Sequence, residues 1–189
     1  MTAMVEPRIQ YATTSDGVSI AYTTTGEGTP LVRTTRLGLG NVQLETLHPD
    51  VQRWFDSLNH HLVTYDPRNA GLSSKSEDYS LDAHVRDLDA VVDAIELDRF
   101  ALYGSRNSGP VAIKYAATHR DRVSRLVLFC ASPDGRTRDG NLSDPMRKLA
   151  RDDWKTYTKA AASDFFAFGA GDFAKDFVRD WQQNFTADE

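Results

Sequence analysis

Residues 99–131 decide the fold, and they read RFALYGSRNSGPVAIKYAATHRDRVSRLVLFCA. The run RFALYG (99–104) is typical of a buried strand, and VSRLVLFCA (123–131) is a second, almost continuously apolar strand. Gly109-Pro110 begins a helix over VAIKYAATH, because proline is tolerated in the first turn, where its missing N–H has no partner to lose. A strand, a helix and a strand in this order predict two parallel strands joined by a crossover.

The preceding sequence extends the same sheet. RIQYAT (8–13) and VSIAYTT (18–24) flank Ser15-Asp16-Gly17, which indicates an antiparallel hairpin. LVRTTR (31–36) and HLVTYD (61–66) are further predicted strands, with a helix near 46–58 between them. Ser80 is the predicted N-cap of a helix whose apolar residues recur every three or four positions: Leu81, Val85, Leu88, Val92 and Ile95. The sequence predicts an α/β fold with a mostly parallel sheet and an N-terminal antiparallel hairpin.

The pattern changes after Ser132. We expect no strand beyond residue 131, and two helical patterns come next, one through Met146, Leu149, Trp154 and Tyr157 and one through Phe173, Phe177, Trp181 and Phe185. This divides the chain into a core over residues 1–132 and a helical segment over residues 133–189.

Composition limits the function. The 189 residues are 40% hydrophobic and carry 22 basic and 27 acidic side chains, a net charge of −5 with the signs interspersed, so nucleic acid is not an expected partner. The sequence shows no secretory signal and no membrane span, which favours a cytoplasmic location and no membrane partner. Cys130 is the single cysteine, and His60 and His61 are adjacent rather than at metal-ligand spacing, so no metal or cofactor is expected.

Three stretches together resemble the α/β-hydrolase superfamily: YDPRNAGLS (65–73), LDAHVRDLDAVVDAIELDRFALYG (81–104) and GSRNSGPVAIKYAATHRDRVSRLVL (104–128). In that family a D-x-R-G-x-G-x-S turn, a helix, a strand and a nucleophile elbow occur in this order. Arg68-Asn69 departs mildly from the family's Arg-Gly. The resemblance implies that the later strands of the fold are missing here. Residues 153–181 resemble the helical cap of members fused to cyclase or LuxR-type regulatory domains.

The resemblance places Arg106 at the nucleophile position. Active relatives carry a serine there, in a G-x-S-x-G turn, whereas this chain reads Gly104-Ser105-Arg106-Asn107-Ser108. A guanidinium stays protonated and is no nucleophile. The flanking Ser105 and Ser108 are alternative catalytic serines, although neither occupies the exposed corner.

No general base is apparent. In the family the histidine comes after the nucleophile, and the only later histidine is His119, about 20 Å away along a helix at 1.5 Å per residue. The earlier histidines, His48, His60, His61 and His84, are interpreted as structural or solvent-facing.

The region of the oxyanion hole is also altered. The resemblance implies that Thr35-Arg36 stands where the family carries a His-Gly or Pro-Gly pair, and that Arg36, Leu37 and Asn107 lie in the former oxyanion-hole region. Arg33 interrupts a strand that should be buried, and an unpaired buried charge is costly. Either an internal salt bridge to a carboxylate such as Asp66 compensates it, or Arg36 and Arg106 converge to bind an anion.

Three functions remain open. The first is a non-catalytic small-molecule-binding or regulatory module, or a remnant, with a small acidic ligand. The second is an ester or amide hydrolase that uses Ser105 or Ser108 and a base from another chain. The third is a structural or dimerisation module. We expect a homo-oligomer through strand 123–131 or the C-terminal helices, because an uncovered apolar edge is a template for pairing.

Overall fold

The structure is a computed structural model that describes residues 8–35, 37, 40–47, 53, 57, 59–131, 133, 144–166, 175–176, 178–179 and 182–183. The chain forms two compact units, Met1–Thr137 and Arg138–Glu189.

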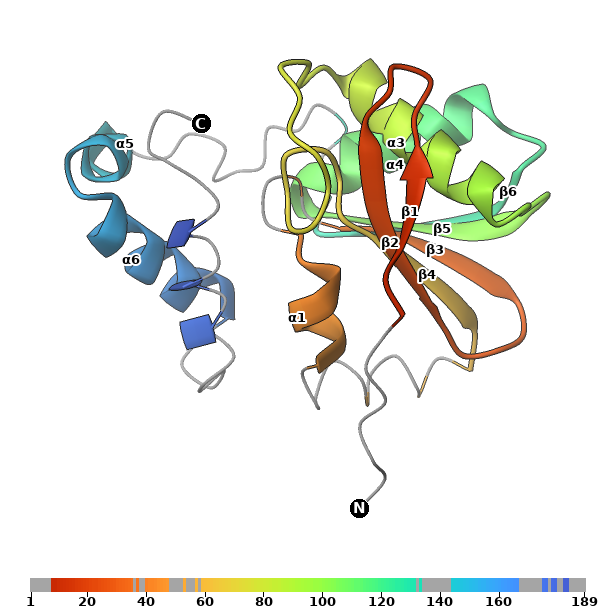
Figure 1. The fold of residues 1–189 in the computed structure, drawn as a ribbon, viewed down its shortest axis with the longest axis horizontal. Helices are drawn as coiled ribbons and strands as arrows, with labels where there is room; N and C mark the ends of the chain where they lie inside the picture. Colours follow the sequence, from red (N-terminus) through yellow and green to blue (C-terminus); the bar gives the residue numbers. More distant parts are fainter. Residues whose placement is uncertain are drawn as a thin grey trace. The chain divides into compact units, whose positions relative to one another are not determined.

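The first unit contains a six-stranded sheet (Figure 1). Its strands are β1 (Gln10–Thr13), β2 (Ser19–Thr25), β3 (Pro30–Thr34), β4 (His61–Tyr65), β5 (Phe100–Ser105) and β6 (Val123–Phe129), in the spatial order β1-β2-β4-β3-β5-β6. The β1–β2 hairpin is antiparallel and β2 runs antiparallel to β4, whereas β4, β3, β5 and β6 are mutually parallel. This confirms the predicted mostly parallel sheet with an antiparallel N-terminal hairpin. Strand β6 ends at Phe129 and β3 at Thr34, each two residues before the predicted end.

Helices α3 (Leu81–Ala94) and α4 (Gly109–Thr118) lie side by side on one face of this sheet, and α1 (Val42–Leu47) lies on the other (Figure 1). The Ser80 side chain accepts a hydrogen bond from the Ala83 N–H at 3.1 Å, which confirms the predicted N-cap of α3. Leu81, in contrast, is exposed, because it precedes the part of α3 that packs on the sheet.

Helix α1 begins at Val42 and ends at Leu47, and most of it precedes the predicted helix near 46–58, so it is a helix that the sequence did not predict. The Asn41 side chain accepts a hydrogen bond from the Leu44 N–H at 2.9 Å, and the Asp66 carboxylate accepts one from the Val42 N–H at 2.8 Å. These two acceptors satisfy N–H groups that have no partner within the helix, so the helix starts at Val42. Of residues 48–58, the structure describes Arg53 and Ser57 as helical; the others lie outside the described residues.

The core lies between the sheet and the α3–α4 layer. Val32, Val63 and Leu102 of the central strands are fully buried. They belong to one cluster with Leu88 of α3 and Tyr115 of α4. The apolar residues of β3, β4 and β5 therefore pack in the interior, as expected for parallel strands covered on both faces.

The second unit contains α5 (Asp144–Asp152) and α6 (Trp154–Phe166), so the single helix predicted through Met146 and Tyr157 is wrong. The helical conformation is interrupted at Asp153. The Asp153 carboxylate accepts hydrogen bonds from the Thr156 N–H at 3.0 Å and from the Thr156 hydroxyl at 2.6 Å. Aspartate competes with the helical backbone in this way, and it caps α6. The predicted stripe of Phe173, Phe177, Trp181 and Phe185 lies outside the described residues.

Two further predictions concern the end of the sheet and the membrane. In the part of the chain that the structure describes, no strand comes after β6. None of the helices built from those residues has the length and apolar content that crossing a bilayer requires.

Candidate functional site

The candidate site is the corner between β5 and α4. β5 ends at Ser105, Arg106 begins a single 3₁₀ turn that ends at Ser108, and α4 starts at Gly109. Arg106 is half-buried and has a φ of 51°, in the left-handed region that residues with a Cβ seldom adopt. Such backbone conformations cluster at functional sites. The predicted strand-to-helix corner at Arg106 is therefore present.

Gly104 explains why the corner can be this tight. A Cβ built on Gly104 would lie 2.6 Å from the Ala112 Cβ, so β5 and α4 approach too closely for any side chain. This close approach brings Arg106 to the C-terminal end of the sheet, where ligands bind in open α/β folds.

Ser108 is fully buried and is part of the scaffold. Its hydroxyl oxygen lies 2.8 Å from the Ser105 carbonyl oxygen and 3.1 Å from the Thr34 carbonyl oxygen, and it accepts a hydrogen bond from the Ser105 N–H at 3.1 Å. The Thr34 hydroxyl oxygen is also 3.1 Å away. One hydroxyl carries one donor and two lone pairs, so these neighbours use its full capacity. Ser108 fastens β3 to the elbow where the family carries glycine.

Asn107 is paired with Leu37 in the loop after β3. The Leu37 N–H donates to Asn107 Oδ1 at 3.3 Å, and Asn107 Nδ2 donates to the Leu37 carbonyl oxygen at 3.0 Å. The structure thus brings together three of the predicted site residues, Leu37, Asn107 and the neighbouring Arg106. Arg36 lies outside the described residues.

Arg33 forms the internal salt bridge that its place in β3 requires, but its partner is not Asp66. Arg33 Nη1 lies 2.5 Å from Glu45 Oε2 of α1, and both side chains are largely buried. Asp66 instead uses its carboxylate to accept hydrogen bonds from the backbone N–H groups of Val42 and Leu72. The predicted internal salt bridge of Arg33 is therefore confirmed, but the predicted partner, Asp66, is wrong. Glu45 is the partner because α1, which begins at Val42, places it beside Arg33.

The histidines that the structure describes lie apart from the elbow or contact a carboxylate elsewhere. His61 starts β4 opposite Pro30, at the end of the parallel strands where β5 begins rather than where it ends. His84 of α3 is buried, with Nδ1 3.5 Å from Asp87 Oδ2. His119 lies just past the far end of α4 and stacks on Tyr115 with ring centroids 4.2 Å apart. His48 lies outside the described residues.

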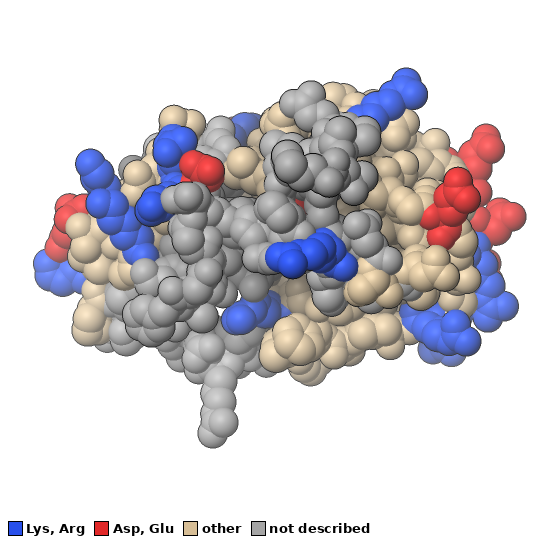
Figure 2. All heavy atoms as spheres, turned by 90° about the horizontal axis from the view of Figure 1, so that it is seen from below, with Lys and Arg blue, Asp and Glu red and all other residues tan. Residues whose placement is uncertain are grey.

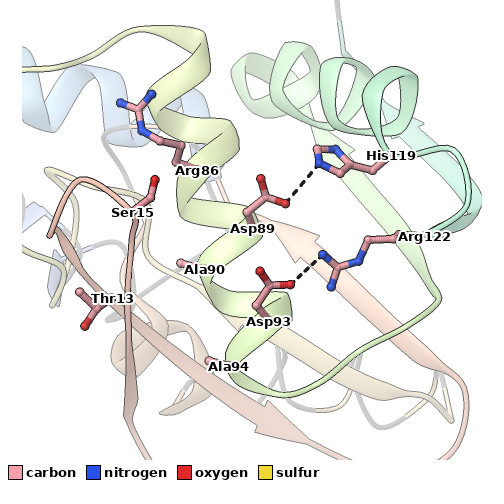
Figure 3. A pocket seen from close by; sticks show the side chains of 9 residues that line it. All are labelled: Thr13, Ser15, Arg86, Asp89, Ala90, Asp93, Ala94, His119 and Arg122. Carbon is pink, nitrogen blue, oxygen red and sulfur yellow. Dashed lines mark ion pairs between the residues drawn. The ribbon is translucent and has the colours of Figure 1, made fainter.

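Figure 3 shows where His119 points: its Nε2 lies 3.6 Å from Asp89 Oδ1, and Arg122 Nη1 lies 2.7 Å from Asp93 Oδ1. These two ion pairs lie beside an open groove of about 540 Å³ between the β1–β2 hairpin and α3. The groove contains none of the predicted site residues; its lining is Thr13, Ser15, Arg86, Asp89, Ala90, Asp93, Ala94, His119 and Arg122.

Sequence reasoning missed a buried charge network around Arg68. Its side chain is fully buried, with Nη2 2.8 Å from Asp87 Oδ1 and Nη1 3.0 Å from Asp16 Oδ2. Asn69, in place of the family's glycine, has a φ of 64°, which asparagine tolerates better than most residues. From the sequence, the Asp-Pro-Arg turn was interpreted as organised by local hydrogen bonds. The one signal for the partner of Arg68 was the place of Asp87 among the apolar positions of α3.

Two further features concern ligands. Among the described residues, no three His, Cys, Asp or Glu side chains converge in a way that could hold a metal ion. Figure 2 shows both acidic and basic side chains on the face that it draws.

The profile of the α/β hydrolase fold family matches residues 40–184. The chain belongs to the α/β-hydrolase fold family. No curated protein sequence matches it significantly. Similar solved structures include an esterase from Exiguobacterium antarcticum, with a TM-score of 0.74, 19% identity, and 94% of this chain and 69% of that one covered.

Two other solved structures give the same result. The esterase RhEst1 from Rhodococcus sp. ECU1013 has a TM-score of 0.75 and 24% identity, covering 93% of this chain and 69% of that one. A bromoperoxidase from Bacillus anthracis has a TM-score of 0.70 and 21% identity, covering 95% and 70%. At these identities the likeness establishes the fold, and this α/β-hydrolase chain is shorter than all three.

Proposed function

We propose that this α/β-hydrolase chain is a non-catalytic binding module that takes a small anionic ligand at the elbow through Arg106. The proposal rests on the position of Arg106. This residue is half-buried, has a φ of 51°, and lies at the corner where active relatives carry their serine. A strained backbone at such a corner is costly, and it persists where the surrounding structure holds it.

Arg106 itself cannot perform the nucleophilic step. A guanidinium carries five N–H donors, has no acceptor, and remains charged at every pH at which proteins are folded. A nucleophile must offer an electron pair to the substrate carbon, which this group does not. The residue at the corner therefore supports recognition of negative charge rather than covalent catalysis.

The alternative serines have weaker support. Ser108 is buried among the carbonyl oxygens of Thr34 and Ser105, so attack on an external carbonyl would require breaking the contacts that hold the elbow to β3. Ser105 is the last residue of β5 and precedes the corner. The described histidines have partners elsewhere or lie at the other end of the strands, and a serine without a base is a poor nucleophile.

Two features of the corner favour an anion. Guanidinium groups bind carboxylates and phosphates through two parallel N–H···O bonds, which are stronger than neutral hydrogen bonds. The N-terminus of the ten-residue α4 begins three residues after Arg106, and helix N-termini stabilise nearby negative charge. The expected ligand class is a small carboxylate or another small acid.

Thermal unfolding with sodium butyrate tests the proposal, with sodium chloride at equal ionic strength as the reference. Butyrate should raise the melting temperature of the unaltered chain, since a ligand that binds only the folded state stabilises it by about 2.7 kcal/mol at 100 times its Kd. Arg106→Gln should abolish the shift. Arg99→Gln, the same change at the residue just before β5 begins, should retain it. Equal shifts in the unaltered chain and Arg106→Gln would contradict the proposal.

A further inference from the structure

The amide side chain of Asn107 makes two hydrogen bonds with a single backbone residue. Oδ1 accepts from the Leu37 N–H at 3.3 Å, and Nδ2 donates to the Leu37 carbonyl oxygen at 3.0 Å. A carboxamide offers an acceptor and a donor side by side, so it satisfies both polar groups of one backbone residue. Leu37 and Asn107 are 70 positions apart, and this pairing joins the loop after β3 to the elbow.

The Leu37 N–H is an unusual group to be occupied in this way. In hydrolases of this fold, an N–H from the loop after this strand and the N–H of the residue after the nucleophile together bind the oxyanion of the substrate. Here the residue after position 106 is Asn107, and its own Oδ1 receives the hydrogen bond of the loop donor. A side-chain carbonyl oxygen thus takes the bond that a substrate carbonyl oxygen would need.

We propose that Asn107 is a specificity-determining residue that internally occupies the oxyanion position and so excludes carbonyl and carboxylate oxygens from the Leu37 N–H. A ligand at the elbow then binds through the Arg106 guanidinium and not through the loop amide. The second statement rests on the proposed function, whereas the first depends only on the geometry of Asn107 and Leu37.

Amide hydrogen exchange measured by NMR tests the first statement. In the unaltered chain the Leu37 amide is expected to exchange slowly, because it is hydrogen-bonded. Asn107→Ala should accelerate this exchange about tenfold, as for the loss of one net hydrogen bond. Asn107→Asp keeps an acceptor at the same place and should retain the slow exchange. Ser80→Ala removes a helix cap elsewhere in the unit and is the matched control; it should leave the Leu37 amide slow.

Titration with butyrate in the same spectra tests the second statement. Butyrate should shift the Arg106 side-chain Nε–H resonance in both chains, and should shift the Leu37 amide resonance only in Asn107→Ala. Butyrate shifting the Leu37 amide of the unaltered chain would overturn the exclusion. Fast exchange of Leu37 in the unaltered chain would overturn the occupancy, even if Asn107→Ala failed to fold.

The two proposals fail differently. If butyrate moves no Arg106 resonance in either chain, the anion-binding function is wrong. The exchange of the Leu37 amide would still decide whether Asn107 occupies the oxyanion position, because that measurement involves no ligand.

Discussion

Arg68 and Asp87 form an ion pair in which both side chains are fully buried, with 2.8 Å between Arg68 Nη2 and Asp87 Oδ1. The Arg68 backbone N–H also donates to Asp87 Oδ2 at 3.0 Å. The turn after β4 is thereby joined to the buried face of α3. Removing Asp87 would take away the fully buried one of the two carboxylates that pair with the Arg68 guanidinium, and leave Asp16 alone to compensate its charge.

Asp87→Asn should therefore be strongly destabilising. Loss of one partner of a buried ion pair lowers the free energy of unfolding by about 3–5 kcal/mol. Urea unfolding at neutral pH measures the change. Asp93→Asn is the control, because Asp93 pairs with Arg122 at the surface, and exposed pairs contribute about 0–1 kcal/mol. If the free energy of unfolding falls by the same amount in both variants, the buried Arg68–Asp87 pair stabilises the fold no more than the exposed Asp93–Arg122 pair.

The surface end of the same network predicts acid sensitivity. Hydrogen bonds from Arg68 and Thr14 hold the pKa of Asp16 well below its ordinary value of 3.8, and those from Ser80 and Arg86 lower the pKa of Asp78 to about 2. The folded chain then binds these protons more weakly than the unfolded chain. The two carboxylates should make their full contribution to the free energy of unfolding above about pH 4. That contribution should be lost as the pH falls from about 4 to 2 and these groups become protonated.

Denaturant unfolding at a series of pH values tests this window. Asp16→Asn should reduce stability at neutral pH and flatten the decline between pH 4 and 2, since one of the responsible carboxylates is gone. A decline of unchanged steepness in Asp16→Asn would assign the acid sensitivity to other groups.

Ser108→Ala should destabilise the elbow. It leaves the Ser105 N–H without its acceptor, and an unsatisfied buried group costs about 1–3 kcal/mol, whereas the Thr34 hydroxyl keeps the Tyr103 carbonyl oxygen at 2.8 Å. The melting temperature should fall, whereas Ser124→Ala, an exposed serine on β6, should change it little. An unchanged melting temperature in Ser108→Ala would mean that the Ser108 hydroxyl does not stabilise the contact between β3 and the elbow.

Strand β6 predicts self-association. Leu126, Val127, Leu128 and Phe129 are 39–57% exposed, and since neighbouring residues of a strand point to opposite faces, both faces of the strand are open. β6 also ends the strand order of the described sheet. We propose that two copies pair through this strand, as an exposed apolar edge favours.

Light scattering tests this association. The unaltered chain should have a mass above the 21.1 kDa of one copy, and Val127→Lys with Phe129→Lys should reduce it to that of a monomer. Leu81→Lys, at an exposed position on α3, should not. A monomer mass for the unaltered chain would contradict the pairing.

The sequence was sufficient for elements determined by local chemistry. The Ser80 cap, the Gly104 corner and the proline at the start of α4 each act within a few residues, so their patterns predict them. The elbow was predictable for the same reason: strand, tight turn and helix are adjacent in the chain.

The sequence predictions were wrong or incomplete where a helix start or a side-chain contact depends on residues far away in the sequence. The start of α1 depends on Asp66, 24 residues away from Val42, and Arg33 pairs with Glu45 only because α1 begins there. The pairing of Asn107 with Leu37 spans 70 positions, and no local pattern indicates it. Asp153 was missed for a different reason, because apolar periodicity continues through the residue that ends one helix and caps the next.

We propose that the elbow of this chain does not catalyse hydrolysis through a serine. The most direct measurement is the hydrolysis of p-nitrophenyl acetate by the purified chain, corrected for the rate with heat-denatured protein. We expect no protein-dependent rate, and none in Arg106→Ser either, because the described histidines are placed or engaged away from the corner. A saturable rate in the unaltered chain that disappears in Ser105→Ala would contradict the account.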